Sequence, residues 1–362
     1  MSGIPVPDPA LEASVREYFE RSGTEAASDF DRTRQFPREL WDTTEQLGLT
    51  LIAVDESHGG SGGSITDLLT VLMTAARYAI PLPLAETALA AYLLASAGIP
   101  VPKGQLTVAP SWRGDTLRLS GGRLRGTVHD VPWARFATSV VALVHDDHGR
   151  ARVVAFDPAR CDRDSGEDLA GLPRDHLHVA QPAELDADTR LGPADLLSMG
   201  ALLRAGQIAG ALTATHLLTS RYVQDRVQFG RPIGTFQAVQ AHTVAIAQAA
   251  QVVAMSTWRA AAGAARRPAR FEAFAAKLVA NESARTAAQA AHQAHGAMGM
   301  TREYPLHLHT RRLNAWQHEF GTERELSVAV GAAVASHSFA RSVADHDPEI
   351  EVAWPPTQRW NS

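Results

Sequence analysis

The alanine-rich stretch that begins near Pro193 constrains the fold of this chain more than any other feature. Alanine has the highest intrinsic helix propensity, and its small side chain lets neighbouring helices approach closely. Apolar residues in this stretch recur at helical spacing. The pattern predicts an antiparallel bundle of long helices at roughly Ala194–Gln224, Phe236–Ala265, Arg270–His295 and Glu323–Ser342.

The residues before this stretch fall into two parts. Up to about residue 100 the pattern predicts helices, including Ile65–Tyr78 and Leu84–Ala97, with Leu47-Gly48-Leu49 also at helical spacing and a glycine-rich break at 54–64. From about Gly104 to Leu185, short β-favouring segments alternate with turns, as in Thr116–Leu119, Ser139–Val144 and Ala151–Phe156. We therefore expect an α+β chain with an N-terminal helical domain (1–104), a small middle β domain (105–190), a C-terminal four-helix bundle (191–345) and a tail (346–362).

Composition and charge exclude several classes of function. The chain has 362 residues and a formal net charge of −5, so it lacks the basic character expected of a nucleic-acid-binding or membrane-surface protein. A single cysteine, Cys161, excludes an internal disulfide framework. We expect no signal peptide, no membrane span and a cytoplasmic location. His307, His309 and His318 lack partners at a recognised ligand spacing, so we expect no metal site.

Three segments carry most of the functional information. In the first, Arg221–Gln240, Arg226 and the side chain of Gln228 could hold a phosphate group, and Phe229 offers a ring for stacking. Alternatively, Arg226 only caps helix carbonyls at a turn between two helices. By itself, the second segment, Gln293–Pro305, is typical of a helix end. The third segment, Arg311–Glu323, is typical of a helix start, with Thr322 as a candidate N-cap.

Taken together, these segments resemble the acyl-CoA dehydrogenase family. The resemblance rests on the motifs Arg226-x-Gln-Phe-Gly-x-Pro-Ile-x-x-Phe-Gln and Gln293-x-x-Gly-Ala-x-Gly-x-x-x-Glu-Tyr-Pro, and on the Val54–Gly62 stretch. It implies an FAD-dependent α,β-oxidation of an acyl-CoA thioester, with an electron-transfer flavoprotein as acceptor. It also implies a set of cofactor-binding residues: Arg226, Gln228, Phe229, Gly230, Gln237, Gln293, Gly296 and Ala297.

The chain departs from the family at the catalytic base. Most members carry Tyr-Glu-Gly-Thr before the last helix, and alignment of Gly321-Thr322 places Phe320 at the glutamate position. Glu319 lies one residue early, so it is a weak candidate base. Other members carry the base on the first helix of the bundle, near Gly200, but residues 196–224 here contain no acidic side chain. The catalytic residue is therefore unknown.

Two further departures concern the substrate and the flavin. Arg204 lies one helical turn after Gly200, where the resemblance implies the acyl pocket; it is a candidate substrate contact, a charge partner for a carboxylate of another chain, or a surface arginine. The β domain lacks the family's glycine-serine flavin loop, and only Thr127 loosely matches the flavin-binding strand.

The retained residues are those that one subunit of the family lends to its neighbour's flavin. The chain therefore resembles the base-lacking subunit of actinobacterial α2β2 acyl-CoA dehydrogenases, which act on steroid side-chain thioesters. Its implied partner is a homologous, base-bearing subunit. Three alternatives stay open: a self-sufficient dehydrogenase that uses Glu319, a flavin monooxygenase of the same fold, and a DNA-binding relative of the fold.

Overall fold

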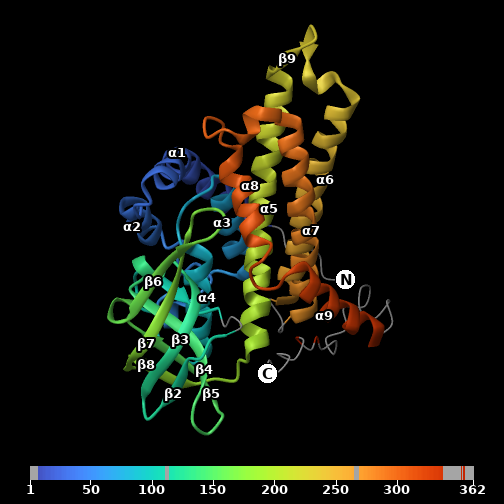
Figure 1. Cartoon of the computed structure of the whole chain (residues 1–362). Coiled ribbons are helices and arrows are strands. Elements are labelled where there is room, and N and C mark those ends of the chain that lie inside the picture. Colours follow the sequence, from blue (N-terminus) through green and yellow to red (C-terminus); the bar gives the residue numbers. More distant parts are fainter. Residues whose placement is uncertain (1–6, 111–113, 265–268, 337–351, 353, 355–362) are drawn as a thin grey trace. The chain divides into compact units, whose positions relative to one another are not determined.

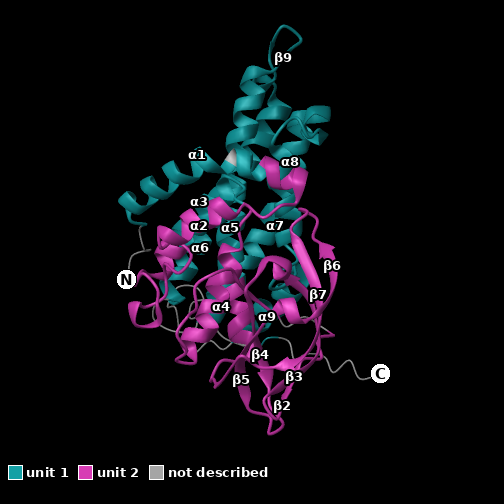
Figure 2. Cartoon of the chain, turned by 90° about the vertical axis from the view of Figure 1, so that its left-hand side faces the viewer, with its two compact units in different colours: residues 1–27, 69–80, 201–362 teal, residues 28–68, 81–200 magenta. Residues whose placement is uncertain are grey.

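The computed structural model describes residues 7–110, 114–264, 269–336, 352 and 354. The chain forms two compact units (Figure 2). Unit 1 contains residues 1–27, 69–80 and 201–362, and unit 2 contains residues 28–68 and 81–200. Three helices continue from one unit into the other: α1 (Pro9–Thr33), α3 (Ile65–Arg77) and α5 (Pro193–Asp225). The predicted α+β class, with helices before and after a β region, is confirmed.

Unit 2 is built on two four-stranded sheets. The first has the order β1-β4-β5-β8, with β1 parallel to β4 and the other pairs antiparallel: Leu106–Val108, Ser139–His145, Ala151–Phe156 and Leu185–Asp188. The second is antiparallel throughout and has the order β2-β3-β7-β6: Arg118–Ser120, Arg123–Pro132, Pro173–Pro182 and Asp162–Glu167. The helical elements that lie wholly in unit 2 are α2 (Arg38–Gln46), α4 (Leu84–Ser96) and the short 3₁₀ turns Glu56–His58, Ala134–Phe136 and Pro158–Arg160.

Alternate residues of both sheets form the core of the β region. Val140, Ala142 and Val144 of β4 join Leu124 and Val128 of β3 in one buried cluster. This spacing of two places every second side chain of each strand on the same face. Helix α4 packs against β1 and β4.

The sequence predictions for unit 2 hold in part. Strands β4 and β5 lie where they were expected, whereas β2 begins at Arg118 and not at Thr116. Leu47-Gly48-Leu49 was wrongly expected to be helical: α2 ends at Gln46, and Gly48 has a φ of +72° that no helix contains. Strand β6 was not predicted, because its sequence, Asp-Arg-Asp-Ser-Gly-Glu, has no apolar alternation and forms a strand only by pairing with β7.

Unit 1 contains the helical bundle (Figure 1). Its helices after α5 are α6 (Gln237–Ala264), α7 (Arg270–His295), α8 (Leu306–Trp316) and α9 (Glu323–Ser336). The first three predicted helices agree with α5, α6 and α7 to within one residue. The fourth agrees over α9, and its last six residues lie outside the described part of the chain, as does most of the predicted tail. Helix α8 was not predicted.

Two glycines let α5 approach α3 closely within unit 1. A Cβ atom built at Gly206 would lie 2.8 Å from Leu69 Cδ2, and one built at Gly210 would lie 2.0 Å from the carbonyl oxygen of Met73. Of the described helices, α5 is the one long and apolar enough to cross a membrane, but 83% of its most apolar window is buried inside the protein. Its apolar character therefore matches its place in the core.

His309 is another buried feature of unit 1. Burial, together with the charges of Arg312 and His307, lowers the pKa of its imidazole to about 3, although a hydrogen bond with the Ala76 backbone raises it. The ring is therefore neutral in the native protein at neutral pH.

We expect Gly210→Ala to lower the free energy of unfolding by about 1–3 kcal/mol or more, because the added methyl group cannot be accommodated beside a backbone carbonyl. Gly331→Ala in α9 is the matched control. Its Cβ would meet no atom within 4 Å, so this change should stabilise the protein by up to about 1 kcal/mol. Urea denaturation of both variants measures the difference, and equal stability would contradict the packing argument.

We also expect stability to fall as the pH drops from about 6.5 towards 3, with a contribution from His309 of up to about 1.4 kcal/mol per pH unit. The folded-state pKa lies below that of the unfolded chain, so in this window the unfolded chain binds a proton that the native protein excludes. Denaturation at pH 7 and pH 5 should show a smaller loss for His309→Gln than for wild type. His148→Gln, on an exposed loop, should retain the wild-type loss.

Candidate functional site

The link between α5 and α6 is a tight hairpin that positions an aromatic side chain. Strands β9 (Val227–Gln228) and β10 (Arg231–Pro232) pair antiparallel around the two-residue loop Phe229-Gly230. Phe229 has a φ of +52° and Gly230 a φ of +80°. Positive φ at both loop residues is the geometry of a type I′ hairpin, which glycine adopts readily and phenylalanine does not.

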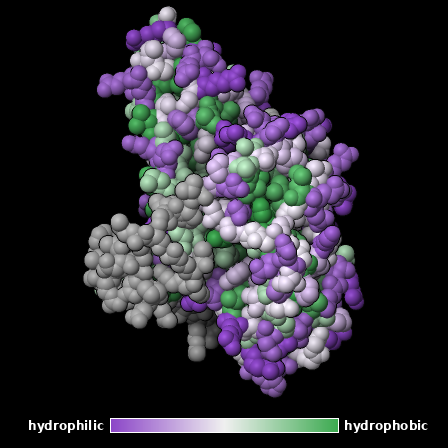
Figure 3. All heavy atoms as spheres, turned by 180° about the vertical axis from the view of Figure 1, so that it is seen from behind, coloured by the Kyte–Doolittle hydropathy of each residue, from purple (hydrophilic) through white to green (hydrophobic). Residues whose placement is uncertain are grey.

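Phe229 combines this backbone strain with a high exposure. Its side chain is 89% exposed, and its ring meets that of Phe236 edge to face at a centroid distance of 5.9 Å. The guanidinium of Arg231 lies 4.3 Å from the centre of the Phe236 ring. Figure 3 shows apolar residues among polar ones at its upper end, and Val227 of β9 is also exposed. Strain and exposed aromatic surface together indicate a binding element.

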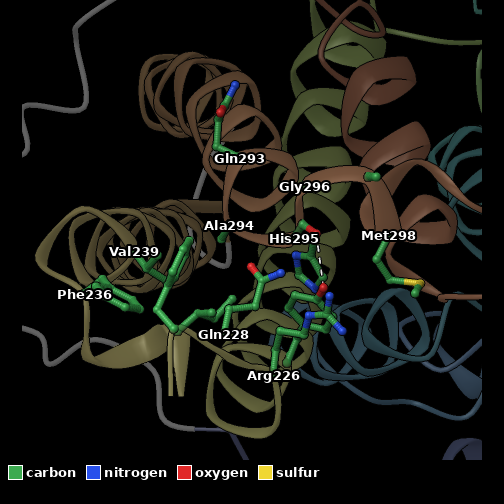
Figure 4. A pocket seen from close by; sticks show the side chains of 13 residues that line it. Arg226, Gln228, Phe236, Val239, Gln293, Ala294, His295, Gly296 and Met298 are labelled. Atoms are coloured by element: carbon green, nitrogen blue, oxygen red, sulfur yellow. Dashed lines mark hydrogen bonds between the residues drawn. The ribbon is translucent and has the colours of Figure 1, made fainter. Parts of the chain in front are cut away.

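A cavity of about 570 Å³ lies beside this hairpin, within the size range of small-molecule sites. Residues from the end of α5, the hairpin, the start of α6 and the end of α7 line it (Figure 4). In Figure 4, Arg226 and Gln228 lie close together, while Gln293 extends away from them. The described lining residues are Tyr222, Arg226, Gln228, Phe229, Ile233, Phe236, Val239, Gln293, Ala294, His295, Gly296, Ala297 and Met298.

Arg226 is the one charged side chain among these described lining residues. Burial lowers the pKa of His295, so its imidazole is neutral at physiological pH. The cavity therefore presents one fixed positive charge, next to an amide at Gln228 and an aromatic ring at Phe229. An arginine in such a position suits a phosphate group, to which it can donate two parallel hydrogen bonds.

The end of α7 is held in place by aromatic packing. The rings of Tyr222 and His295 stack at 4.4 Å, and the Tyr222 hydroxyl donates to the His295 carbonyl at 3.2 Å. Tyr304 packs against both rings and donates its hydroxyl to the carbonyl of Leu218 at 2.9 Å. These contacts fix the backbone at Gly296, whose φ of +58° would strain any other residue.

Six of the eight predicted cofactor-binding residues line this one cavity: Arg226, Gln228, Phe229, Gln293, Gly296 and Ala297. Gly230 completes the hairpin loop and Gln237 starts α6, and neither lines the cavity. Sequence reasoning did not assign Tyr222, His295 or Met298 to the site. Tyr222 could have been found, because it lies four residues before Arg226 on the same helical face.

The other two predicted site residues, Arg204 and Glu319, contact each other elsewhere in unit 1. Arg204 Nη2 donates to Glu319 Oε2 at 2.5 Å, and the two side chains are 2% and 10% exposed. Arg204 also donates to Gln207, and its guanidinium lies 5.5 Å from the Trp316 ring and 5.7 Å from the Phe320 ring. The sequence left open whether Arg204 meets a substrate, another chain or solvent; in the structure its carboxylate partner is Glu319 of its own chain.

Lys277 of α7 extends this group. Its ammonium donates to Asn281 Oδ1 at 2.5 Å, to the Trp316 carbonyl at 2.9 Å and to the Gly321 carbonyl at 3.5 Å. Burial lowers its pKa to about 7, although Glu319 raises it and Arg204 lowers it. We call Arg204, Gln207, Lys277, Asn281 and Glu319 the buried charge cluster.

The segment before α9 also contains the position aligned with the family's glutamate. Phe320 at that position is 3% exposed and has a φ of +53°. Thr322 is the N-cap that the sequence indicated: its hydroxyl and amide both contact Glu325 Oε2, at 2.9 and 3.1 Å, in a capping box. The third motif therefore forms a helix start. It also contains Phe320, the position aligned with the family's glutamate.

Other expected features have a structural role or lie outside the described residues. The Thr127 hydroxyl forms a hydrogen bond with His178 Nδ1 at 3.1 Å. Residues 111–113 lie outside the part of the chain that the structure describes. They belong to the region where the family's glycine-serine flavin loop was not found in the sequence. No group of three or more His, Cys, Asp or Glu side chains suited to a metal ion occurs among the residues described.

Comparison with known proteins identifies the family. A model of the acyl-CoA dehydrogenase N-terminal domain matches residues 8–105, and one of the C-terminal domain matches residues 194–334. The acyl-CoA dehydrogenase IpdE2 of Mycobacterium tuberculosis is 29% identical over 311 residues, which cover 81% of this chain and 86% of that protein.

Solved structures share the fold. One chain of the ChsE4-ChsE5 complex from Mycobacterium tuberculosis superposes with a TM-score of 0.86 at 22% identity, over 93% of this chain and 100% of that one. A chain of the Tcur3481-Tcur3483 steroid ACAD does so with a TM-score of 0.81 at 23% identity, over 90% and 97%. With the domain models spanning most of its length, the chain belongs to the acyl-CoA dehydrogenase family.

Proposed function

We propose that this chain provides the pyrophosphate- and adenosine-binding half of an FAD site in a heteromeric acyl-CoA dehydrogenase, while a homologous partner chain provides the catalytic base. The observation that carries the proposal is an asymmetry. Six of the eight residues that the resemblance assigns to a neighbour's flavin line one cavity, whereas the position of the family's glutamate holds a buried phenylalanine.

The cavity fits the dinucleotide end of FAD. Arg226 is placed to pair with the pyrophosphate, the Gln228 amide to donate to it, and the exposed Phe229 ring to cover an adenine. At Gly296 a Cβ would meet no other atom within 4 Å, so this stretch of backbone is open to a ligand. Bound FAD would supply the hydride acceptor for the β-carbon of the acyl group; this chain's residues would bind and orient it.

A base within this chain is less well supported. Glu319 is the nearest acidic residue to the family position, yet it is buried against Arg204. The self-sufficient dehydrogenase is therefore the second candidate function, and the heteromer is preferred.

The relatives support a proposal for the substrate class and the partners. Tcur3481-Tcur3483 is a steroid ACAD, and ChsE4 and ChsE5 form a complex. We propose a CoA thioester with a bulky, steroid-like acyl group, a homologous subunit in an α2β2 arrangement, an electron-transfer flavoprotein as acceptor, and a cytoplasmic location. Fewer complete sites per assembly would leave more room for a bulky acyl group at each.

Flavin stoichiometry tests the half-site. We expect the chain alone to be colourless and inactive, and its complex with a co-expressed, base-bearing homologue to contain one FAD per two chains. The two halves of the site would then come from different subunits, so one site forms per pair. Absorbance at the flavin band against protein concentration measures the ratio. A yellow isolated chain that oxidises acyl-CoA would contradict the proposal.

Arg226→Met should weaken FAD retention by the complex roughly 10- to 100-fold, because a charge-assisted hydrogen bond to phosphate contributes about 1.5–3 kcal/mol. Arg221→Met is the matched control: this exposed arginine lies on the same helix and forms a surface pair with Asp225. Flavin fluorescence during dilution of the complex measures release. Equal release from both variants would exclude Arg226 from the flavin site.

A further inference from the structure

The segment between α8 and α9, residues 317–322, is held at three points by buried groups from α5 and α7. Lys277 donates to the carbonyls of Trp316 and Gly321, one on each side of Glu319. Asn281 Nδ2 donates to the Gly321 carbonyl at 3.1 Å. Arg204 holds the Glu319 side chain between these two points. The segment is therefore bound at both ends and in the middle.

The backbone of this segment is strained where it is held. Phe320 occupies the left-handed region with a φ of +53°, and Gly321 follows with a φ of +112°. A Cβ at Gly321 would lie 2.8 Å from two atoms of the Leu326 side chain. A non-glycine residue in this conformation persists only where the surroundings determine it. The buried charge cluster supplies those surroundings.

The charges in the cluster depend on one another. Arg204 is a buried cation, Glu319 is the carboxylate that contacts it, and Lys277 is a buried amine whose pKa is lowered to about 7, chiefly by burial. Loss of the Glu319 carboxylate would leave the guanidinium without this counter-charge in the protein interior. Breaking a buried ion pair in this way is strongly destabilising. The contact that holds the segment therefore depends on both members of the pair.

We propose that Arg204 and Lys277 are positioning residues that hold the 317–322 segment in its observed conformation. Glu319 then acts as their structural counter-ion and not as a proton acceptor. The inference goes with the proposed function, since it explains why the acidic residue nearest the family's base position does not serve as one. It concerns the chain by itself, so it is tested without flavin or partner.

Hydrogen–deuterium exchange of the isolated full chain provides the first test. Arg204→Met and Glu319→Gln should each accelerate amide exchange in residues 317–322 by roughly 100-fold, because each leaves a buried charged or polar group without its partner. The double variant Arg204→Met/Glu319→Leu removes both groups and should return exchange to within about tenfold of wild type. Unchanged exchange in the single variants would overturn the proposal. Exchange in the double variant as fast as in the single variants would also overturn it.

An exposed ion pair directly after the segment provides a control. Arg285 of α7 and Glu323 of α9 form an ion pair at 3.7 Å with side chains that are 52% and 45% exposed. Arg285→Met and Glu323→Gln should change exchange in residues 317–322 by less than about threefold, because solvent screens exposed pairs. A control effect as large as that of the buried pair would show that any change between α7 and α9 opens the segment, and would overturn the specific role of Arg204.

Turnover by the assembled enzyme separates the counter-ion from a base. Glu319→Gln, where it assembles, should keep kcat within about threefold, whereas loss of a general base would lower kcat by roughly 10²–10⁴. A large loss of kcat with unchanged exchange and KM would identify Glu319 as the base and overturn the proposal. Failure of the half-site model would appear instead in the flavin ratio, which these variants leave unaltered.

Discussion

The buried ion pair between Arg204 and Glu319 is the interaction on which the arrangement of the bundle end depends. It joins α5 to the segment before α9, and Lys277 adds α7 through two backbone carbonyls. Buried charges are tolerated only with partners in good geometry, so these groups specify one arrangement of three helices. At the position aligned with the family's glutamate, this chain has the buried Phe320, next to this ion pair.

The other end of unit 1 follows the opposite design. The hairpin after α5 exposes Phe229 in a strained conformation, and Arg226 lines the cavity beside it. These features do not stabilise an isolated chain. They are suited to a ligand that brings phosphate groups and a planar ring, and to an assembly in which that surface is covered. One end of the unit is thus held together by its own buried ion pair, whereas the other end has a cavity and an exposed aromatic ring.

The two ends together account for the division of labour in the proposed function. A chain whose base position is occupied by Phe320 gains nothing from a complete flavin site of its own. In the proposed function, the motifs around Arg226 and Gly296 would serve a neighbour's flavin. The close packing of α5 on α3 depends on other residues, Gly206 and Gly210. The residues that pack these helices are therefore different from those proposed to bind the flavin.

Strong local patterns in the sequence were enough to locate several elements. The alanine-rich periodicity located α5, α6 and α7, β-favouring runs located β4 and β5, and the motifs around Arg226 and Gly296 named six of the thirteen lining residues of the cavity. Local propensity and spacing suffice for such features. Only the tertiary structure decided the rest. Strand β6 is polar and exists by pairing, and Tyr222 enters the site by stacking on a ring more than 70 residues away. Arg204 and Glu319, 115 residues apart, were two separate candidates in the sequence, and folding made them a single ion pair.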